Sequence, residues 1–260
     1  MLRSKLVVLC LSVHALPCAW AQEAAPVTTL LGAGLWSRPA YDGASNSQAT
    51  APIPVVRHYG RTWFARTTYG VLEGGARAEV ASGLTVGAQL AYEGGRSQAE
   101  SSFLSANKVA DLPFSVSWGA HIEYEKNIGP MPLIALLRYR QDADGQRGAQ
   151  TDLRLTAGVF SGGGLNAGVF AQVTWADAKA TQYYYGLSPA QAAVTGLPVY
   201  EAQGGQLFNA AGLLWSYDLT PKWMLLGSFE ARRLRGDALA SPLVQVSGNG
   251  YASLSLAYQF

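Results

Sequence analysis

The last thirteen residues read GNGYASLSLAYQF (248–260) and alternate between apolar and polar side chains. Successive side chains of a β-strand point to opposite faces, so one face carries Ala252, Leu254, Leu256, Tyr258 and Phe260. The serines and Gln259 point the other way. One face suits lipid and the other suits water, which is typical of the last strand of an outer-membrane β-barrel. We predict that Tyr258 and Phe260 contact the barrel-assembly machinery.

The first 21 residues are expected to be a secretory signal peptide that is cleaved. Arg3 and Lys5 precede an apolar run, and Ala19-Trp-Ala21 matches a cleavage site. The mature protein is then a single domain, residues 22–260. Both cysteines, Cys10 and Cys18, leave with the signal, so no disulfide can stabilise the mature chain.

Charge and hydropathy narrow the class of protein. The chain has 19 Lys+Arg and 17 Asp+Glu, and loss of the two basic residues of the signal leaves equal numbers, which does not support binding to nucleic acid. The hydrophobic fraction is 49%, yet no segment after the signal reaches the roughly 18 apolar residues of a transmembrane helix. If the chain crosses a bilayer, it does so with strands.

Alternating segments recur along the whole chain. The clearest is 114–125, where apolar side chains alternate with Ser115, Ser117, His121 and Glu123. The predicted strands are 27–36, 53–59, 62–69, 71–80, 84–93, 114–125, 133–140, 151–160, 168–176, 207–217, 223–232 and 248–260. We therefore predict an all-β fold, a transmembrane antiparallel β-barrel of about twelve strands.

The lengths of the connections alternate as such a barrel requires. Short periplasmic turns are predicted near Gly60 and at 81–83, 127–130, 161–164 and 220–221. Long extracellular loops are predicted at 37–51, 94–112, 141–150, 177–206 and 233–248, and a tight turn near Gly70 is the one exception.

Aromatic residues fall at both ends of the outward face, as two membrane-interface girdles would. The periplasmic girdle contains Tyr124, Tyr217, Trp223, Tyr258 and Phe260, and the outer girdle contains Trp36, Tyr92, Tyr139 and Trp175. A soluble barrel with an apolar interior is the alternative, but twelve strands would enclose a void that side chains cannot fill.

Charged residues fall on the lumenal face, with both signs present. The candidate lumenal residues are His121, Glu123, Arg138, Arg140, Arg154, Glu230 and Arg232. Mixed signs indicate internal salt bridges or a pore with little ion preference. His121 is expected to be hydrogen-bonded within the lumen rather than to serve a Ser-His hydrolase, so we expect no enzyme, no cofactor and no metal site.

The longest outer loop, 177–206, is expected to carry a short helix. Ser188 can cap it, Pro189 suits its first turn, Gln191 completes a capping box and Gly196 can end it. The candidate lid residues are Tyr183, Tyr184, Tyr185, Ser188 and Tyr200. The loop is either a lid or plug over the pore or a segment packed on the barrel rim. A further outer loop contains Arg235-Gly-Asp237, an adhesion tripeptide.

Several stretches together resemble the MipA/OmpV family of outer-membrane proteins. They are PAYDGAS (39–45), YYGLS (184–188), GLPVY (196–200), LTPKW (219–223) and RLRGDALASPL (233–243). The resemblance implies an outer-membrane barrel without a catalytic motif. For the family's namesake it implies a scaffold that joins a murein lytic transglycosylase to a bifunctional peptidoglycan synthase. Other members are described as surface antigens, adhesins or small-solute channels.

The leading hypothesis from the sequence is a non-enzymatic scaffold of the cell wall, embedded in outer-membrane lipid, with a lytic transglycosylase and a peptidoglycan synthase as possible partners. A small-solute pore with a loop lid and a surface adhesin or antigen are the alternatives.

Overall fold

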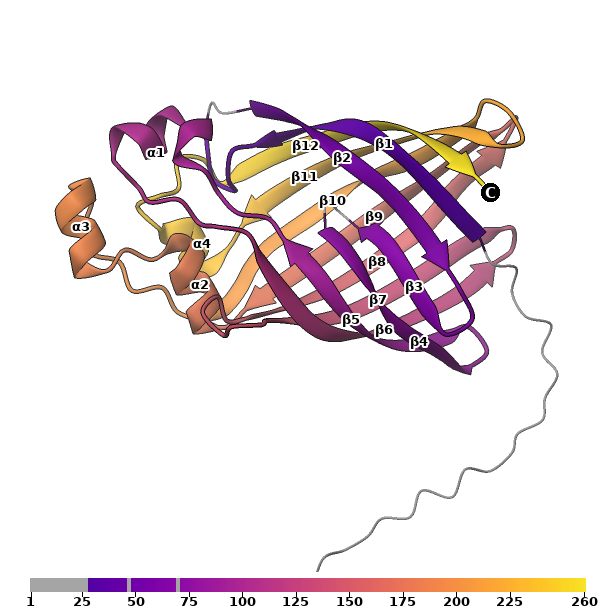
Figure 1. Ribbon diagram of the computed structural model, residues 1–260, viewed down its shortest axis with the longest axis horizontal. Helices are drawn as coiled ribbons and strands as arrows, with labels where there is room; N and C mark the ends of the chain where they lie inside the picture. Colours follow the sequence, from indigo (N-terminus) through magenta and orange to yellow (C-terminus); the bar gives the residue numbers. More distant parts are fainter. Residues whose placement is uncertain (1–27, 46–47, 69–70) are drawn as a thin grey trace, which may run out of the picture.

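The computed structural model describes residues 28–45, 48–68 and 71–260. The predicted signal peptide and the predicted turn near Gly70 lie outside these residues. The described residues form twelve antiparallel strands that close into one barrel, because β1 pairs with both β2 and β12 (Figure 1). The predicted fold class is confirmed.

The strands follow the alternating segments of the sequence. Their bounds are β1 Thr28–Pro39, β2 Gln48–Tyr59, β3 Trp63–Thr68, β4 Val71–Ala81, β5 Leu84–Glu93, β6 Ser115–Ile128, β7 Met131–Asp142, β8 Ala149–Gly162, β9 Leu165–Ala176, β10 Gly205–Asp218, β11 Trp223–Leu234 and β12 Gly248–Gln259. The helices are α1 Ser102–Ala106, α2 Ala178–Tyr185, α3 Pro189–Thr195 and α4 Gly236–Ala240. None of the helices in the described ranges is long and apolar enough to cross a membrane.

The two faces of β12 differ as the period of two requires. Leu254 is 54% exposed on the outside, whereas Ser255 is 6% exposed and Ala257 is fully buried inside. Because a closed barrel leaves no strand edge and turns its apolar face outward, the chain is built to span a bilayer.

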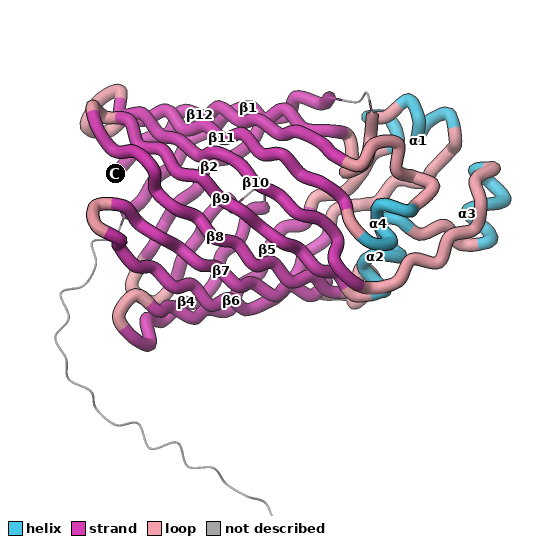
Figure 2. The backbone as a smooth tube through the Cα atoms, turned by 180° about the vertical axis from the view of Figure 1, so that it is seen from behind, coloured by secondary structure: helices cyan, strands magenta, loops and turns pink. Residues whose placement is uncertain are grey.

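The two ends of the barrel differ in the way the loop lengths predict. The turns after β2, β4, β6, β8 and β10 lie at the end where the chain reaches Phe260, and the four helices lie at the opposite, outer end (Figures 1 and 2). The structure therefore places the long loops together on the outer side.

One predicted loop, 37–51, is too long at both ends. The ladder between β1 and β2 continues to the pair Pro39–Gln48, so residues 37–39 and 48–51 belong to strands and the connection is 40–47. β2 contains Pro52 and Pro54, and proline cannot donate to a ladder. Both prolines share the edge of β2 from which the Val56 N–H donates to Thr67 Oγ1 (3.3 Å), and β3 pairs with β2 only over residues 57–59. The prolines therefore remove donors that β3 would not satisfy.

The predicted girdles are confirmed except at Trp36. Leu35 is outward and 58% exposed, so Trp36 points inward, and its partner across the ladder is the inward Ser253. Trp36 lies against Arg38 inside the barrel, with 5.6 Å between the guanidinium carbon and the ring centroid.

We expect Leu254→Arg to lower the free energy of unfolding by about 2–4 kcal/mol, because an arginine near the middle of the lipid-facing belt is poorly solvated. The control is Val199→Arg in an outer loop, where the side chain is similarly exposed (51%) but faces water. Reversible unfolding in lipid vesicles measures both changes. Equal effects would contradict the assignment of the outward face to lipid.

Candidate functional site: a lumenal ion network beneath an outer cap

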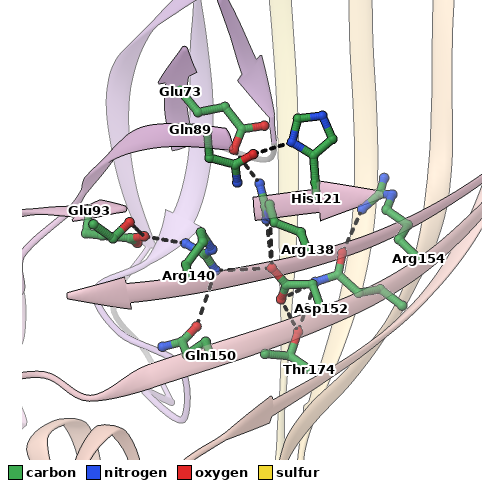
Figure 3. Close-up of polar contacts among 12 residues, drawn as sticks. Glu73, Gln89, Glu93, His121, Arg138, Arg140, Gln150, Asp152, Arg154 and Thr174 are labelled. Carbon is green, nitrogen blue, oxygen red and sulfur yellow. Dashed lines mark hydrogen bonds and ion pairs between the residues drawn. The ribbon is translucent and has the colours of Figure 1, made fainter. Parts of the chain in front are cut away.

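A chain of ion pairs crosses the lumenal wall from β3 to β8 (Figure 3). Glu73 lies between two arginines, at 2.6 Å from Arg66 Nε and 3.0 Å from Arg138 Nη1. Asp152 likewise accepts from Arg138 Nη2 (2.9 Å) and Arg140 Nη2 (3.3 Å). Glu73 therefore links an arginine of β3 to one of β7, and Asp152 joins the two arginines of β7, so the four pairs form one network.

The strand register produces this network. Arg66 is directly opposite Glu73 on β4, and Arg138 is directly opposite Asp152 on β8. Such cross-strand neighbours have Cβ atoms about 5 Å apart, so opposite charges meet without loop flexibility. Glu73 is 1% exposed and Asp152 is 2% exposed. At this depth the side chains brace the wall and are shielded from water.

Further polar residues extend the network at its margins. Arg66 Nη1 donates to Glu123 (3.0 Å), and Arg140 Nη1 donates to Glu93 (2.5 Å). Thr174 Oγ1 donates to Asp152 (2.8 Å). The outermost members of the ion network are therefore two carboxylates, Glu123 and Glu93, and the hydroxyl group of Thr174.

His121 and Arg154 lie beside this network. His121 Nδ1 is 2.5 Å from Gln89 Oε1, and its ring meets Phe64 edge-on. Arg154 donates to Gln172 Oε1 (3.1 Å) and stacks over the ring of Phe170. The structure therefore gives His121 an amide partner within the wall.

Glu230 and Arg232 form a separate cluster on β11. Arg232 contacts Glu230 and Asp42 (2.8 Å each), and the Tyr251 hydroxyl donates to the same Asp42. The seven candidate lumenal residues are thus divided between two places in the barrel. Asp42 comes from the first outer loop, so this cluster joins that loop to β11, which lies two strands from β1 in the barrel.

Sequence reasoning missed Arg66, Glu73, Glu93 and Asp42 as members of these clusters. Arg66 and Glu73 lie where glycines and short strands weaken the alternation. The predicted hairpin of strands 62–69 and 71–80 is the signal that could have found them, because a turn near Gly70 places Arg66 opposite Glu73. Asp42 offered no such signal, because its partner Arg232 is 190 residues away.

The outer loops pack against one another and form a cap. One buried cluster contains Leu104, Val109, Leu187 and Leu243, which come from the loops after β5, β9 and β11, and Tyr41 from the loop after β1 packs against it. These loops leave the barrel at separated points of its rim, so they can meet only across the mouth. An ion pair (3.0 Å) also joins Arg38, at the outer end of β1, to Glu100 in the loop after β5.

The loop between β9 and β10 contains two short helices. α3 has the Ser188–Gln191 capping box, Pro189 in its first turn and Gly196 at its left-handed end. α2 precedes it and begins at Asp177, whose side chain accepts from the Ala180 N–H.

The tyrosines of this loop hold the cap together. Tyr185 is buried in a cluster with Phe170 and Phe208, beneath the cap. Arg147 lies over the ring of Tyr183, and Arg96 donates to the carbonyl oxygen of Tyr184 (3.0 Å). The Tyr200 hydroxyl donates to the carbonyl oxygen of Asp237 (2.8 Å). The loop thus lies across the barrel mouth and does not extend down the lumen.

The Arg235-Gly-Asp237 tripeptide belongs to the same cap. Asp237 Oδ2 accepts from the Gln203 N–H (2.7 Å), and α4 starts within the tripeptide. The carboxylate on which adhesion would depend is therefore engaged within the protein.

Metal-ligating side chains do not gather at the site in the described part of the chain. No group of three His, Cys, Asp or Glu side chains there could hold a metal ion. A cavity of about 20 Å³ beneath Tyr184, lined by Glu93, Arg140 and Arg147, has room for one water molecule.

Residues 31–260 match the sequence family described as MltA-interacting protein MipA. The chain belongs to this family. Together with the closed barrel and its outward apolar belt, membership places the protein in the bacterial outer membrane.

Relatives with assigned names share a shorter segment. The MltA-interacting proteins of Escherichia coli K12 and Shigella flexneri are each 29% identical over 101 residues, which is 39% of this chain and 40% of each relative. The alignment therefore spans less than half of these relatives.

Two solved structures illustrate similar barrels. An outer membrane channel from Pseudomonas putida F1 has a TM-score of 0.47 and 13% identity, covering 95% of this chain and all of that one. The translocator domain of the autotransporter NalP from Neisseria meningitidis has a TM-score of 0.43 and 13% identity, covering 92% and 90%. At this level of similarity they do not bear on function.

Glu73→Ala is expected to destabilise the barrel by about 3–5 kcal/mol, because Arg66 and Arg138 would keep their charge without their shared carboxylate. Glu100→Ala in the partly exposed Arg38–Glu100 pair is the control and should cost about 1 kcal/mol or less. Guanidinium unfolding in detergent compares the two variants. If both lose the same small amount, the network does not brace the wall.

Burial in the cap raises the pKa of Tyr41 from 10.0 to about 12, although the nearby Arg96 opposes the shift. The neutral phenol is therefore favoured in the folded state, and its contribution to stability is complete below about pH 10 and is lost as pH rises through about 12. Phenolate absorbance of the wild type minus that of Tyr41→Phe should titrate near pH 12. A midpoint near 10 would show that Tyr41 is not buried in the cap.

Proposed function

We propose that this protein is a non-catalytic outer-membrane anchor that docks a murein lytic transglycosylase at its periplasmic end. Family membership supports the proposal, since the named relatives are MltA-interacting proteins. The observation that carries the proposal is that the charges of the lumen are already paired with one another in a buried network. The outer loops are likewise packed against one another in the cap. The exposed charges of the periplasmic rim are the ones accessible to a soluble periplasmic protein.

The periplasmic rim offers a flat surface that carries both signs of charge. Its exposed basic residues are Arg57, Arg61, Lys126 and Lys222, and its exposed acidic residues are Glu79, Glu125 and Asp218. The turns between the strands are only a few residues long, so they cannot enclose a partner. A flat rim of mixed charge suits electrostatic docking, in which charges set the association rate and the orientation.

A peptidoglycan synthase is the proposed second partner, joined through the transglycosylase or through an adjacent part of the rim. Tyr258 and Phe260 lie on the outward face at this end, and their rings meet edge to face (4.9 Å between ring centroids). We infer that they serve assembly, as contacts for the barrel-assembly machinery, and leave the rim charges to the cell-wall enzymes.

Retention of partners by the detergent-solubilised barrel tests this function. Tagged full-length protein should retain a lytic transglycosylase from the same cells. Arg61→Glu combined with Lys222→Glu should weaken retention roughly fivefold, because both changes reverse rim charges. Lys179→Glu in α2, at the outer end, is the matched control and should have no effect.

Failure of the wild type to retain any transglycosylase would overturn the anchor. Ion currents in a planar bilayer would then favour the small-solute pore. The mixed charges of the lumen are the feature that supports this alternative.

A further inference from the structure

A groove of about 650 Å³ lies on the barrel wall formed by β9 to β12 and reaches Ser37 at the outer end of β1. These four strands lie side by side and are seen together in Figure 2. The groove is lined by outward side chains that would contact lipid, including Val169, Ala211, Leu213, Phe229 and Ala231. It lies toward the outer ends of the strands, since Gly250 and Ala252 of its lining are near the outer start of β12.

The register explains how the groove forms. Ala211, Ala231 and Gly250 are cross-strand neighbours, so one row across the wall has little or no side chain. Two residues toward the periplasm, Leu213 and Phe229 form a row of large side chains. The large side chains project further from the wall than the small ones and form one side of the groove. Phe229 belongs to this side and is 57% exposed.

Arg233 stands on the other side of the groove. It is two residues beyond Ala231 on the same face of β11, which is about 7 Å along the strand. Its neighbour Arg232 points inward to Glu230 and Asp42, whereas Arg233 is outward and exposed. The guanidinium group can therefore reach the space directly above the row of small residues.

Arg233 is the one charged residue on the outward faces of β9, β10, β11 and β12, all of whose residues the structure describes. Its cross-strand neighbours are Asn209 and Gly248. An arginine next to lipid is costly unless it reaches the interface or an anion. Glu230 also lines the groove, but its carboxylate points inward to Arg232, so the outward faces of these strands supply no carboxylate and the anion must come from what covers the wall.

We propose that this groove is a specific site for a phosphorylated lipid of the outer leaflet, with one acyl chain against Ala211, Ala231 and Gly250 and a lipid phosphate bound by Arg233. An extended saturated chain matches a shallow apolar groove bordered by Phe229. Arginine suits phosphate because its planar donors bind two oxygen atoms at once. The site is independent of the proposed periplasmic docking.

A second copy of the chain fits this surface less well. A symmetric contact would use the same patch on both copies. It would bring the two Arg233 side chains into one apolar interface with no carboxylate on either wall. A phosphorylated lipid supplies both the apolar chain and the negative charge.

Native mass spectrometry of the delipidated, full-length barrel with added bisphosphorylated lipid A tests the site. Arg233→Gln should lower lipid occupancy about tenfold, the effect of losing a charged hydrogen bond. Ala231→Phe fills the groove without a change of charge and should lower occupancy to a similar extent. The controls are Lys222→Gln at the periplasmic end and Ala33→Phe, which adds a ring to the exposed outward face of β1; neither should alter occupancy.

The source of the phosphate is tested with two further lipids. Dephosphorylated lipid A should bind wild type and Arg233→Gln equally weakly, and phosphatidylglycerol should bind less tightly than bisphosphorylated lipid A. Retained heat-modifiable migration in gels shows that each variant is folded. Unchanged lipid A occupancy in folded Arg233→Gln and Ala231→Phe would overturn the proposal, and loss of a dimer in Ala231→Phe with unchanged lipid binding would assign the groove to a second copy.

Discussion

The structure depends on one constraint: a backbone that crosses lipid must satisfy its own hydrogen bonds. The pairing of β1 with β12 meets this constraint, because it removes the last free edges of the sheet. Closure then divides the side chains into an outward set that contacts lipid and an inward set that does not. The edge of β2 shows the same constraint locally, since Pro52 and Pro54 lack the N–H groups that the short β3 would leave unpaired.

The inward set explains why so many charges can be carried by a membrane-spanning sheet. Glu73 and Asp152 each bridge two arginines, so each charge of this network has a partner at hydrogen-bond distance. Buried ion pairs add little net stability by themselves, but they are costly to break. Their role here is to make one register and one wall geometry strongly preferred. The outer cap acts in the same direction, because four loops share one apolar cluster.

Different kinds of side chain occupy different levels along the axis of the barrel. The outer end is occupied by packed loops, the middle by ion pairs, and the periplasmic rim by exposed charges of both signs. The outward face adds a fourth surface, where Arg233 stands alone above an apolar groove. An anchor needs a stiff wall and an accessible rim. This barrel has buried ion pairs in its wall and exposed charges on its rim, which are the features that the proposed role would use.

The amino-acid sequence by itself determined the alternation of faces, the number of strands and the side on which the long loops lie. These features follow from a period of two and from turn residues, which are local properties. The short α3 is local as well, because its cap, its first turn and its end lie within nine residues of one another.

Only the tertiary structure decided which charges meet. Arg66 reaches Glu123 across three intervening ladders, and Arg232 reaches Asp42 in a loop 190 residues away. Trp36 points inward because one residue of register reverses a whole strand face. These contacts depend on the stagger of twelve strands and on closure, so no short segment contains the information that specifies them.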